Sequence, residues 1–183
     1  MGVTRAVGDR VVFLDRDGVI NRPYVRDGVS RPPATLEGLE ILPGVPEALR
    51  RLRAAGYRLI VVTNQPDVAR GTVARETVEA IHERLHAQLT LDEIRVCYHD
   101  DADGCVCRKP KPGLLRMGAP VDFSASVIVG DRWRDIEAGR AAGCLTVLVS
   151  SGDSEPLPHD PDVRVSSLLE AADWIVANTR QRS

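Results

Sequence analysis

The chain has no long apolar run, no excess of either charge and few aromatic residues. In its 183 residues no apolar segment approaches the roughly 20 residues that span a bilayer, so we expect no membrane segment. Residues 1–9 lack the apolar core of a secretory signal, which predicts a cytoplasmic protein whose cysteines are thiols or metal ligands. The formal net charge of -2 and the 4% aromatic content argue against nucleic-acid binding, which favours basic surfaces and stacking platforms.

The rest of the composition is that of an ordinary globular protein, with 43% hydrophobic and 27% charged residues. The length suits one domain over residues 1–183 with a single core, and a monomer is the default expectation. Apolar segments alternate with helical patterns, which predicts an α/β fold with a doubly wound parallel sheet. The expected strands are residues 11–14, 59–62, 94–98, 127–129 and 145–149.

Helices and loops are expected between these strands. Residues 21–42 are rich in proline, glycine and arginine, which predicts an irregular loop at the mouth of a site. Residues 151–161 are similar and are expected to connect the last strand to the last helix. Helices are expected over residues 45–55, after Thr72 as N-cap, soon after Asp131, and from near Ser167.

Two carboxylates one residue apart, followed by a glycine, close the first expected strand in the sequence FLDRDG. At the C-terminal end of a strand in an open α/β sheet, such groups project into the crevice where ligands bind. Asp15 could then attack phosphorus while Asp17 transfers protons. Taken alone, the motif could also be a turn or part of a calcium loop, but the further acidic positions and terminal glutamate of a calcium hand do not follow.

Further polar groups follow the other expected strands, and they are the groups that phosphoryl transfer needs. Because these groups lie at strand ends or in neighbouring loops, we expect them to converge on one crevice. The ordered motifs DRDGVIN, VVTNQ, CRKPKPG and VGDRWRDIEAG resemble the haloacid dehalogenase superfamily of phosphatases. Within it they resemble the branch of heptose bisphosphate and histidinol-phosphate phosphatases. The groups are Thr63, Asn64, Gln65, Arg108, Lys109, Asp131 and Asp135.

This resemblance implies a magnesium-dependent phosphomonoesterase without a large cap domain. Asp15 would form an aspartyl-phosphate, and Asp17 would protonate the leaving oxygen and then activate water. The resemblance places Mg²⁺ between Asp15, the backbone carbonyl of Asp17, Asp131 and a phosphate oxygen. Thr63 and Lys109 would hold the phosphoryl oxygens as charge redistributes.

The resemblance also implies supporting and substrate-binding residues. Asp135 would brace the magnesium site or Lys109. Arg26 and Arg134 are instead expected to be solvated surface residues. Among the contacts to substrate, Arg108 would read the part beyond the transferred phosphoryl group, because a guanidinium matches phosphate oxygens. The substrate-binding residues are expected to be Arg16, Asn64, Gln65, Arg108 and Arg132.

Three cysteines and a histidine lie close together in the sequence, at Cys97, His99, Cys105 and Cys107. This ligand set suits a closed tetrahedral zinc site, although ordinary strand residues, exposed thiols or a disulfide would also fit the pattern. The resemblance favours a structural Zn²⁺ in a loop at about residues 97–107. Cys144 stands apart and is expected to be a small buried residue.

The segment HERLH matches the metalloprotease pattern, in which His82 and His86 would bind zinc and Glu83 would act as base. The apolar stripe of this helix runs through Ile81 and Leu85, so both histidines are expected to face solvent. No third ligand is evident, which argues against a protease.

The resemblance to this branch implies removal of the C7 phosphate from D-glycero-D-manno-heptose 1,7-bisphosphate, with histidinol phosphate as the alternative substrate. Pro66 and Asp67 stand where the heptose branch commonly has serine and glycine, and Pro66 removes a backbone donor. Less favoured alternatives are a polynucleotide end phosphatase and a zinc-stabilised binding module without activity. The full set of catalytic groups argues against the second.

Overall fold

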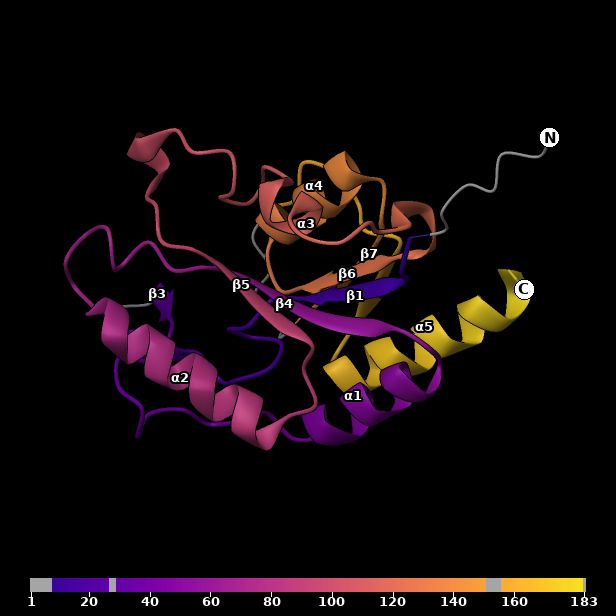
Figure 1. Cartoon of the computed structure of the whole chain (residues 1–183), viewed down its shortest axis with the longest axis horizontal. Helices are drawn as coiled ribbons and strands as arrows, with labels where there is room; N and C mark the ends of the chain where they lie inside the picture. Colours follow the sequence, from indigo (N-terminus) through magenta and orange to yellow (C-terminus); the bar gives the residue numbers. More distant parts are fainter. Residues whose placement is uncertain (1–7, 27–28, 151–155, 183) are drawn as a thin grey trace.

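A six-stranded sheet runs through the centre of the computed structural model, which describes residues 8–26, 29–150 and 156–182 (Figure 1). Its strand order is β5-β4-β1-β6-β7-β8, and every neighbouring pair is parallel. The predicted doubly wound parallel sheet is therefore confirmed. The strands are β1 (Val11–Leu14), β4 (Arg58–Asn64), β5 (Glu93–Cys97), β6 (Val127–Gly130), β7 (Leu145–Val149) and β8 (Val163–Val165).

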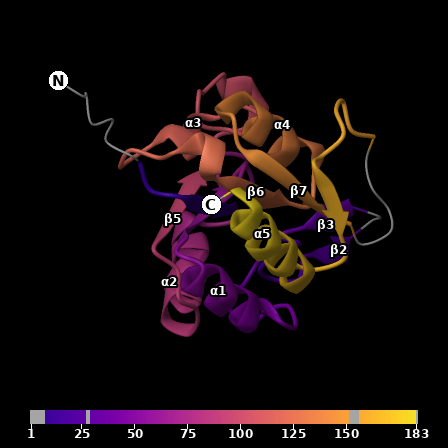
Figure 2. The ribbon, with the colours of Figure 1, turned by 90° about the vertical axis from the view of Figure 1, so that its right-hand side faces the viewer.

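Helices cover both faces of the sheet because the central strands are apolar on both sides. In β1, Val12 and Leu14 join one buried cluster and Val11 and Phe13 join the other, as the alternation of side chains along a strand requires. Figures 1 and 2 show the resulting three layers. The first face carries α1 (Val45–Ala54), α2 (Arg75–Gln88) and α5 (Leu168–Arg182), and the second carries α3 (Gly113–Arg116) and α4 (Trp133–Ala142).

Two pieces of the fold differ from the sequence prediction. The expected irregular loop contains a hairpin of β2 (Tyr24–Arg26) and β3 (Val29–Arg31), and the connection after β7 contains β8. Each of these strands has three residues, too few for a period-2 pattern to stand out among prolines and glycines. Residues 151–155 of the expected connector lie outside the described residues.

Helix starts follow the prediction except at α2. Ser167 accepts a hydrogen bond from the backbone of Glu170 at 3.2 Å, as expected for the start of α5. Thr72 is not the N-cap of α2, because its hydroxyl donates to the carbonyl of Asp67 at 3.2 Å within the preceding loop. The residue before α2 is Ala74, which provides no side-chain cap.

The strand order creates a switch point beside β1. From β1 the chain builds outward through β4 and β5, then returns to the other side of β1 for β6, β7 and β8. Ligands bind at such switch points, outside the carboxyl ends of the strands. In the described part of the chain, the segments after β1 and β4 contain, besides α1 and α2, only the hairpin and loops, so this edge carries no large cap. No described helix has the length and apolar character needed to cross a membrane.

Candidate active site

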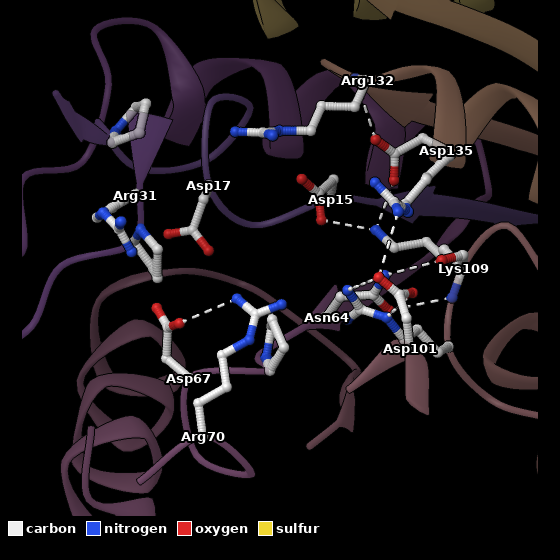
Figure 3. Close-up of a pocket in the computed structure, with 15 residues that line it drawn as sticks. Asp15, Asp17, Arg31, Asn64, Asp67, Arg70, Asp101, Lys109, Arg132 and Asp135 are labelled. Atoms are coloured by element: carbon white, nitrogen blue, oxygen red, sulfur yellow. Dashed lines mark hydrogen bonds and ion pairs between the residues drawn. The ribbon is translucent and has the colours of Figure 1, made fainter. Parts of the chain in front are cut away.

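A cavity of about 340 Å³ opens at the switch point (Figure 3). Leu14 pairs in register with Val61 of β4 and Val129 of β6, so the residues that follow these strands come together. The lining includes seven of the predicted site residues, which are Asp15, Asp17, Asn64, Arg108, Lys109, Arg132 and Asp135.

Lys109 is the buried centre of the site. Its ammonium donates to Asp15 Oδ1 at 2.7 Å, to Asp135 Oδ1 at 2.5 Å and to the carbonyl of Val62 at 2.7 Å. These three bonds use all its donors. Burial opposes its charge, but the carboxylates of Asp135 and Asp15 outweigh this effect and raise the pKa of Lys109. Asn64 fixes the loop, because its side chain exchanges two hydrogen bonds of 3.1 Å with the backbone of Lys109.

Burial raises the pKa of Asp15 to about 6, although the nearby ammonium of Lys109 opposes the shift. The carboxylates of Asp135 and Asp17 contribute to the same rise in pKa. Since Lys109 occupies one oxygen of Asp15, the second oxygen is available to a reacting group. The cavity wall thus holds a carboxylate that is partly desolvated and fixed in direction, as a nucleophile requires.

Three carboxylates can share a cation here. Oxygens of Asp15, Asp131 and Asp135 all lie within 4.8 Å of one another. Burial, followed by the charges of Asp15 and Asp135, raises the pKa of Asp131 well above its usual range. Its Oδ1 is buried and accepts no hydrogen bond from the described residues, with Arg132 Nε 4.0 Å away. Crowded carboxylates with an unsatisfied oxygen fit a hard divalent cation such as Mg²⁺.

Asp17 faces the cavity and is held from behind. Its carboxylate accepts hydrogen bonds from the guanidinium of Arg16 at 3.1 to 3.2 Å, from Asn21 at 2.9 Å and from Gln65 at 2.9 Å. Gln65 also donates to Thr63 at 2.9 Å. Three side chains therefore orient Asp17 directly, and Thr63 holds one of them.

Besides Asp131 and the predicted zinc ligands, three predicted site residues do not line the cavity. Thr63, Gln65 and Arg16 have exposed fractions of 1%, 2% and 0%, and they form a layer behind Asp17. The structure thus places Arg16 and Gln65 against Asp17, where the sequence had predicted contact with substrate.

Charged residues that the sequence did not predict form the rim. Arg70 donates to Asp100 at 2.6 Å, and Arg108 donates to Asp101 at 2.7 Å. Arg134, which the sequence predicted to be a solvated surface residue, is 31% exposed, but it also lies 3.5 Å from Asp101 and lines the cavity. The side chain of Arg26 lies outside the described residues. Charged residues clustered near the motifs were the signal from which this rim could have been predicted. The additional lining residues are Pro23, Arg31, Pro32, Pro66, Asp67, Arg70, Asp101 and Arg134.

The predicted zinc ligands converge beside this rim. The sulfur of Cys107 lies 3.1 Å from that of Cys97 and 3.5 Å from that of Cys105, and 3.4 Å from Nδ1 of His99. Tetrahedral zinc ligands are separated by about 3.5 to 3.8 Å when the metal–ligand bonds are those of protein sites. The sulfur of Cys97 lies 3.5 Å from Nδ1 of His99 and 3.7 Å from the sulfur of Cys105. Apart from the shorter contact between Cys97 and Cys107, these separations are close to the tetrahedral spacing, so the donor set fits Zn²⁺. Cys144 is buried in an apolar cluster, as predicted.

The HERLH segment of α2 gives a second correction. His86 is exposed as predicted, but His82 is only 8% exposed, and its Nε2 lies 3.1 Å from Arg16 Nη1. Helical periodicity placed His82 off the apolar stripe, yet Arg16 supplies a polar partner beneath the helix. Within the described residues, neither histidine belongs to a group of three possible metal ligands, which excludes the metalloprotease arrangement there.

Known proteins match both the sequence and this geometry. A family model for haloacid dehalogenase-like hydrolases matches residues 12–93, and a HAD-hydrolase-like model matches residues 106–171. D-glycero-beta-D-manno-heptose-1,7-bisphosphate 7-phosphatase of Bordetella bronchiseptica is 38% identical, over 79% of this chain and 82% of its own length. The chain belongs to the haloacid dehalogenase-like hydrolases. It is a phosphatase of that family.

Other relatives of this hydrolase carry related names. D-glycero-alpha-D-manno-heptose-1,7-bisphosphate 7-phosphatase of Mycobacterium bovis is 38% identical, over 84% of this chain and 86% of its own. The crystal structure of D,D-heptose 1,7-bisphosphate phosphatase from B. bronchiseptica with magnesium and phosphate has a TM-score of 0.75 and 32% identity. It covers 92% of this chain and 99% of that one.

Proposed function

We propose that this hydrolase removes the C7 phosphate of a D-glycero-D-manno-heptose 1,7-bisphosphate through an aspartyl-phosphate. The observation that carries the proposal is the placement of Asp15, Lys109 and Asp17 around one open cavity. A nucleophile, a cation and a proton donor are the groups that phosphoryl transfer needs. The relatives named for this reaction support the choice of substrate.

The chain's own residues divide the reaction between them. The second oxygen of Asp15 attacks phosphorus in line. Lys109, whose three donors are already used, keeps Asp15 oriented and places its positive charge beside the transferred phosphoryl group as charge redistributes. Asp17 donates a proton to the departing sugar oxygen and then takes one from the attacking water. The hydroxyl of Thr63 lies behind Gln65 and keeps that amide on Asp17. Thr63 would leave this position only if bound substrate drew its hydroxyl toward the phosphoryl group.

Two metals complete the proposal. Asp15, Asp131 and the Asp17 carbonyl would hold Mg²⁺, which supplies positive charge for the approach of a carboxylate to a phosphate. Cys97, His99, Cys105 and Cys107 would hold a structural Zn²⁺, whose four protein ligands leave no position for water.

The rim would read the distal phosphate. Arg108 and Arg132 line the cavity, and Arg108 is already paired with Asp101. Arg31 lines the cavity from the hairpin, and its buried Nε has no hydrogen-bond partner among the described residues. We therefore add Arg31 to the residues that would bind this phosphate. Asp67 also lines the cavity, and its carboxylate would accept hydrogen bonds from sugar hydroxyls. A serine or glycine at this position would carry no charge.

Phosphate release from a panel of substrates tests the proposed function. We expect Mg²⁺-dependent release of phosphate from one anomer of heptose 1,7-bisphosphate, with kcat/KM at least about 100-fold above that for histidinol phosphate. The reason is that the guanidinium groups on the rim would bind a second phosphate, which histidinol phosphate lacks. Both anomers are needed, since the relatives are named for each. Preference for histidinol phosphate would select the alternative substrate. Preference for a phosphorylated DNA end would contradict both the heptose and the histidinol hypotheses.

Replacing Gly18 by alanine is expected to weaken magnesium binding. Gly18 has φ +90°, and a Cβ there would lie 2.3 Å from Oδ2 of Asp131, so the carboxylate would have to move. We expect the Mg²⁺ concentration for half-maximal activity to rise at least about tenfold. Gly71→Ala is the matched control, because Gly71 also has positive φ but no atom lies within 4 Å of the place that its new methyl group would take. An unchanged Mg²⁺ requirement in Gly18→Ala would contradict the role of Asp131.

A further inference from the structure

Arg16 is a fully buried cation whose two edges have different partners. Its Nε and Nη2 donate to the carboxylate of Asp17 at 3.1 to 3.2 Å. Its Nη1 lies 3.1 Å from Nε2 of His82 on α2. The side chain of Arg16 has no exposed surface, so water cannot reach its guanidinium. These contacts therefore supply the hydrogen-bond partners that water would otherwise provide.

His82 must be the acceptor in this pair. A guanidinium can only donate, so Nε2 of His82 carries the lone pair and the ring is neutral. Burial and the charge of Arg16 lower the pKa of His82 to about 4, which agrees with a neutral ring near pH 7. The apolar residues Ile81 and Leu85 anchor this part of α2 in the core, so His82 has a fixed position.

We propose that His82 is a positioning residue for proton transfer, acting through Arg16 on Asp17. The inference rests on the proposed function, in which Asp17 protonates the leaving oxygen. By accepting from Nη1, His82 fixes the plane of the guanidinium, and the opposite edge then holds the Asp17 carboxylate toward the cavity. The histidine itself touches neither the cavity nor the reacting atoms.

Loss of His82 as an acceptor should slow the departure of the leaving group more than the other steps of the reaction. Without His82, a buried donor of Arg16 lacks a partner, and the side chain must turn or admit water. Asp17 keeps its bonds from Asn21 and Gln65 but loses its fixed cation. Departure of a sugar alkoxide needs the proton of Asp17, whereas p-nitrophenolate leaves without one. The damage should therefore depend on the leaving group.

The experiment compares kcat/KM for two substrates in four proteins. The substrates are p-nitrophenyl phosphate and the sugar phosphate that the wild type turns over best, because kcat/KM reports the step in which the leaving group departs. The proteins are the wild type, His82→Leu, His82→Gln and His86→Leu. Gln places an acceptor near the position of Nε2, and His86 is an exposed neighbour on the same helix.

We expect His82→Leu to lower kcat/KM for the sugar phosphate by about 10- to 100-fold and that for p-nitrophenyl phosphate by less than about threefold. His82→Gln should recover most of the loss, and His86→Leu should match the wild type. Equal losses on both substrates, or no loss, would overturn the inference while leaving the proposed function intact. A wild type inactive on every phosphate ester would overturn both.

Folding is checked by thermal unfolding of each variant. If His82→Leu does not fold, His82→Asn replaces it, because asparagine is polar but too short to reach Nη1. The same leaving-group dependence is then expected for His82→Asn, together with recovery in His82→Gln. Its absence in a folded His82→Asn protein would overturn the inference.

Discussion

Asp15→Asn is expected to lower kcat by about four orders of magnitude or more, because the variant has no nucleophile to form an aspartyl-phosphate. The amide nearly matches the carboxylate in size and can still lie beside Lys109, so binding of substrate should be retained. Phosphate release under saturating substrate measures the loss. Acid quenching of the wild type during turnover should also trap a hydroxylamine-sensitive phosphoenzyme that is missing from the variant. Activity within tenfold of wild type would exclude Asp15 as the nucleophile.

The same variant should be at least as stable as the wild type without magnesium. Burial raises the pKa of Asp15 from 3.8 to about 6, so the unfolded chain loses this proton at lower pH than the folded protein. The ionised carboxylate therefore destabilises the fold progressively as pH rises from about 4 to about 6, and by a constant amount above. An asparagine has no such dependence.

Thermal unfolding in a chelator checks this sign. The Tm of Asp15→Asn minus that of the wild type should increase between pH 4 and pH 6 and then level off. A lower Tm for the variant throughout would show that the ion pair of Asp15 with Lys109 is net stabilising. If Asp15→Asn keeps its stability but loses turnover, Asp15 is a residue whose catalytic role lowers the stability of the fold.

The sequence predicted correctly that polar groups at the ends of neighbouring strands would lie at one edge of the sheet. Apolar runs locate β1, β4 and β6, and parallel register then brings Asp15, Thr63 and Asp131 to one edge. Lys109 was predicted from a motif in a loop rather than from a strand, and the structure places its ammonium between Asp15 and Asp135. At these positions the local sequence pattern and the geometry of a parallel sheet lead to the same placement, so little knowledge of tertiary contacts was needed to predict it.

Contacts between elements distant in sequence could not be predicted in this way. His82 is 66 residues from Arg16, and periodicity reports only which face of a helix is apolar. A polar residue at the edge of that face is buried when another element supplies a partner. The pairing of Arg134 with Asp101, 33 residues away, was hidden for the same reason. In both cases the position of a polar side chain depends on a partner that is far away in the sequence.

Cys107→Ser is expected to have the largest effect on stability. The sulfur of Cys107 lies within 3.5 Å of a donor atom of each of the three other proposed zinc ligands, and serine is a poor ligand for such a soft site. Loss of a structural metal should lower the free energy of unfolding by more than about 4 kcal/mol, or roughly 8 to 16 °C in Tm for a chain of this length. Zinc analysis and thermal unfolding measure the two effects, and Cys144→Ala, at a buried thiol outside the cluster, is the control.

Activity should fall when the proposed zinc is lost, even though its four ligands lie outside the cavity. The loop closed by Cys107 carries Asp100 and Asp101, which pair with Arg70 and Arg108 on the rim. Lys109 follows two residues later, so a loosened loop displaces the cation that holds Asp15. We expect kcat/KM in Cys107→Ser to fall at least about tenfold, as second-layer changes do, while Cys144→Ala stays near wild type. A zinc-free variant with full activity and unchanged Tm would mean that the rim is ordered by its ion pairs alone.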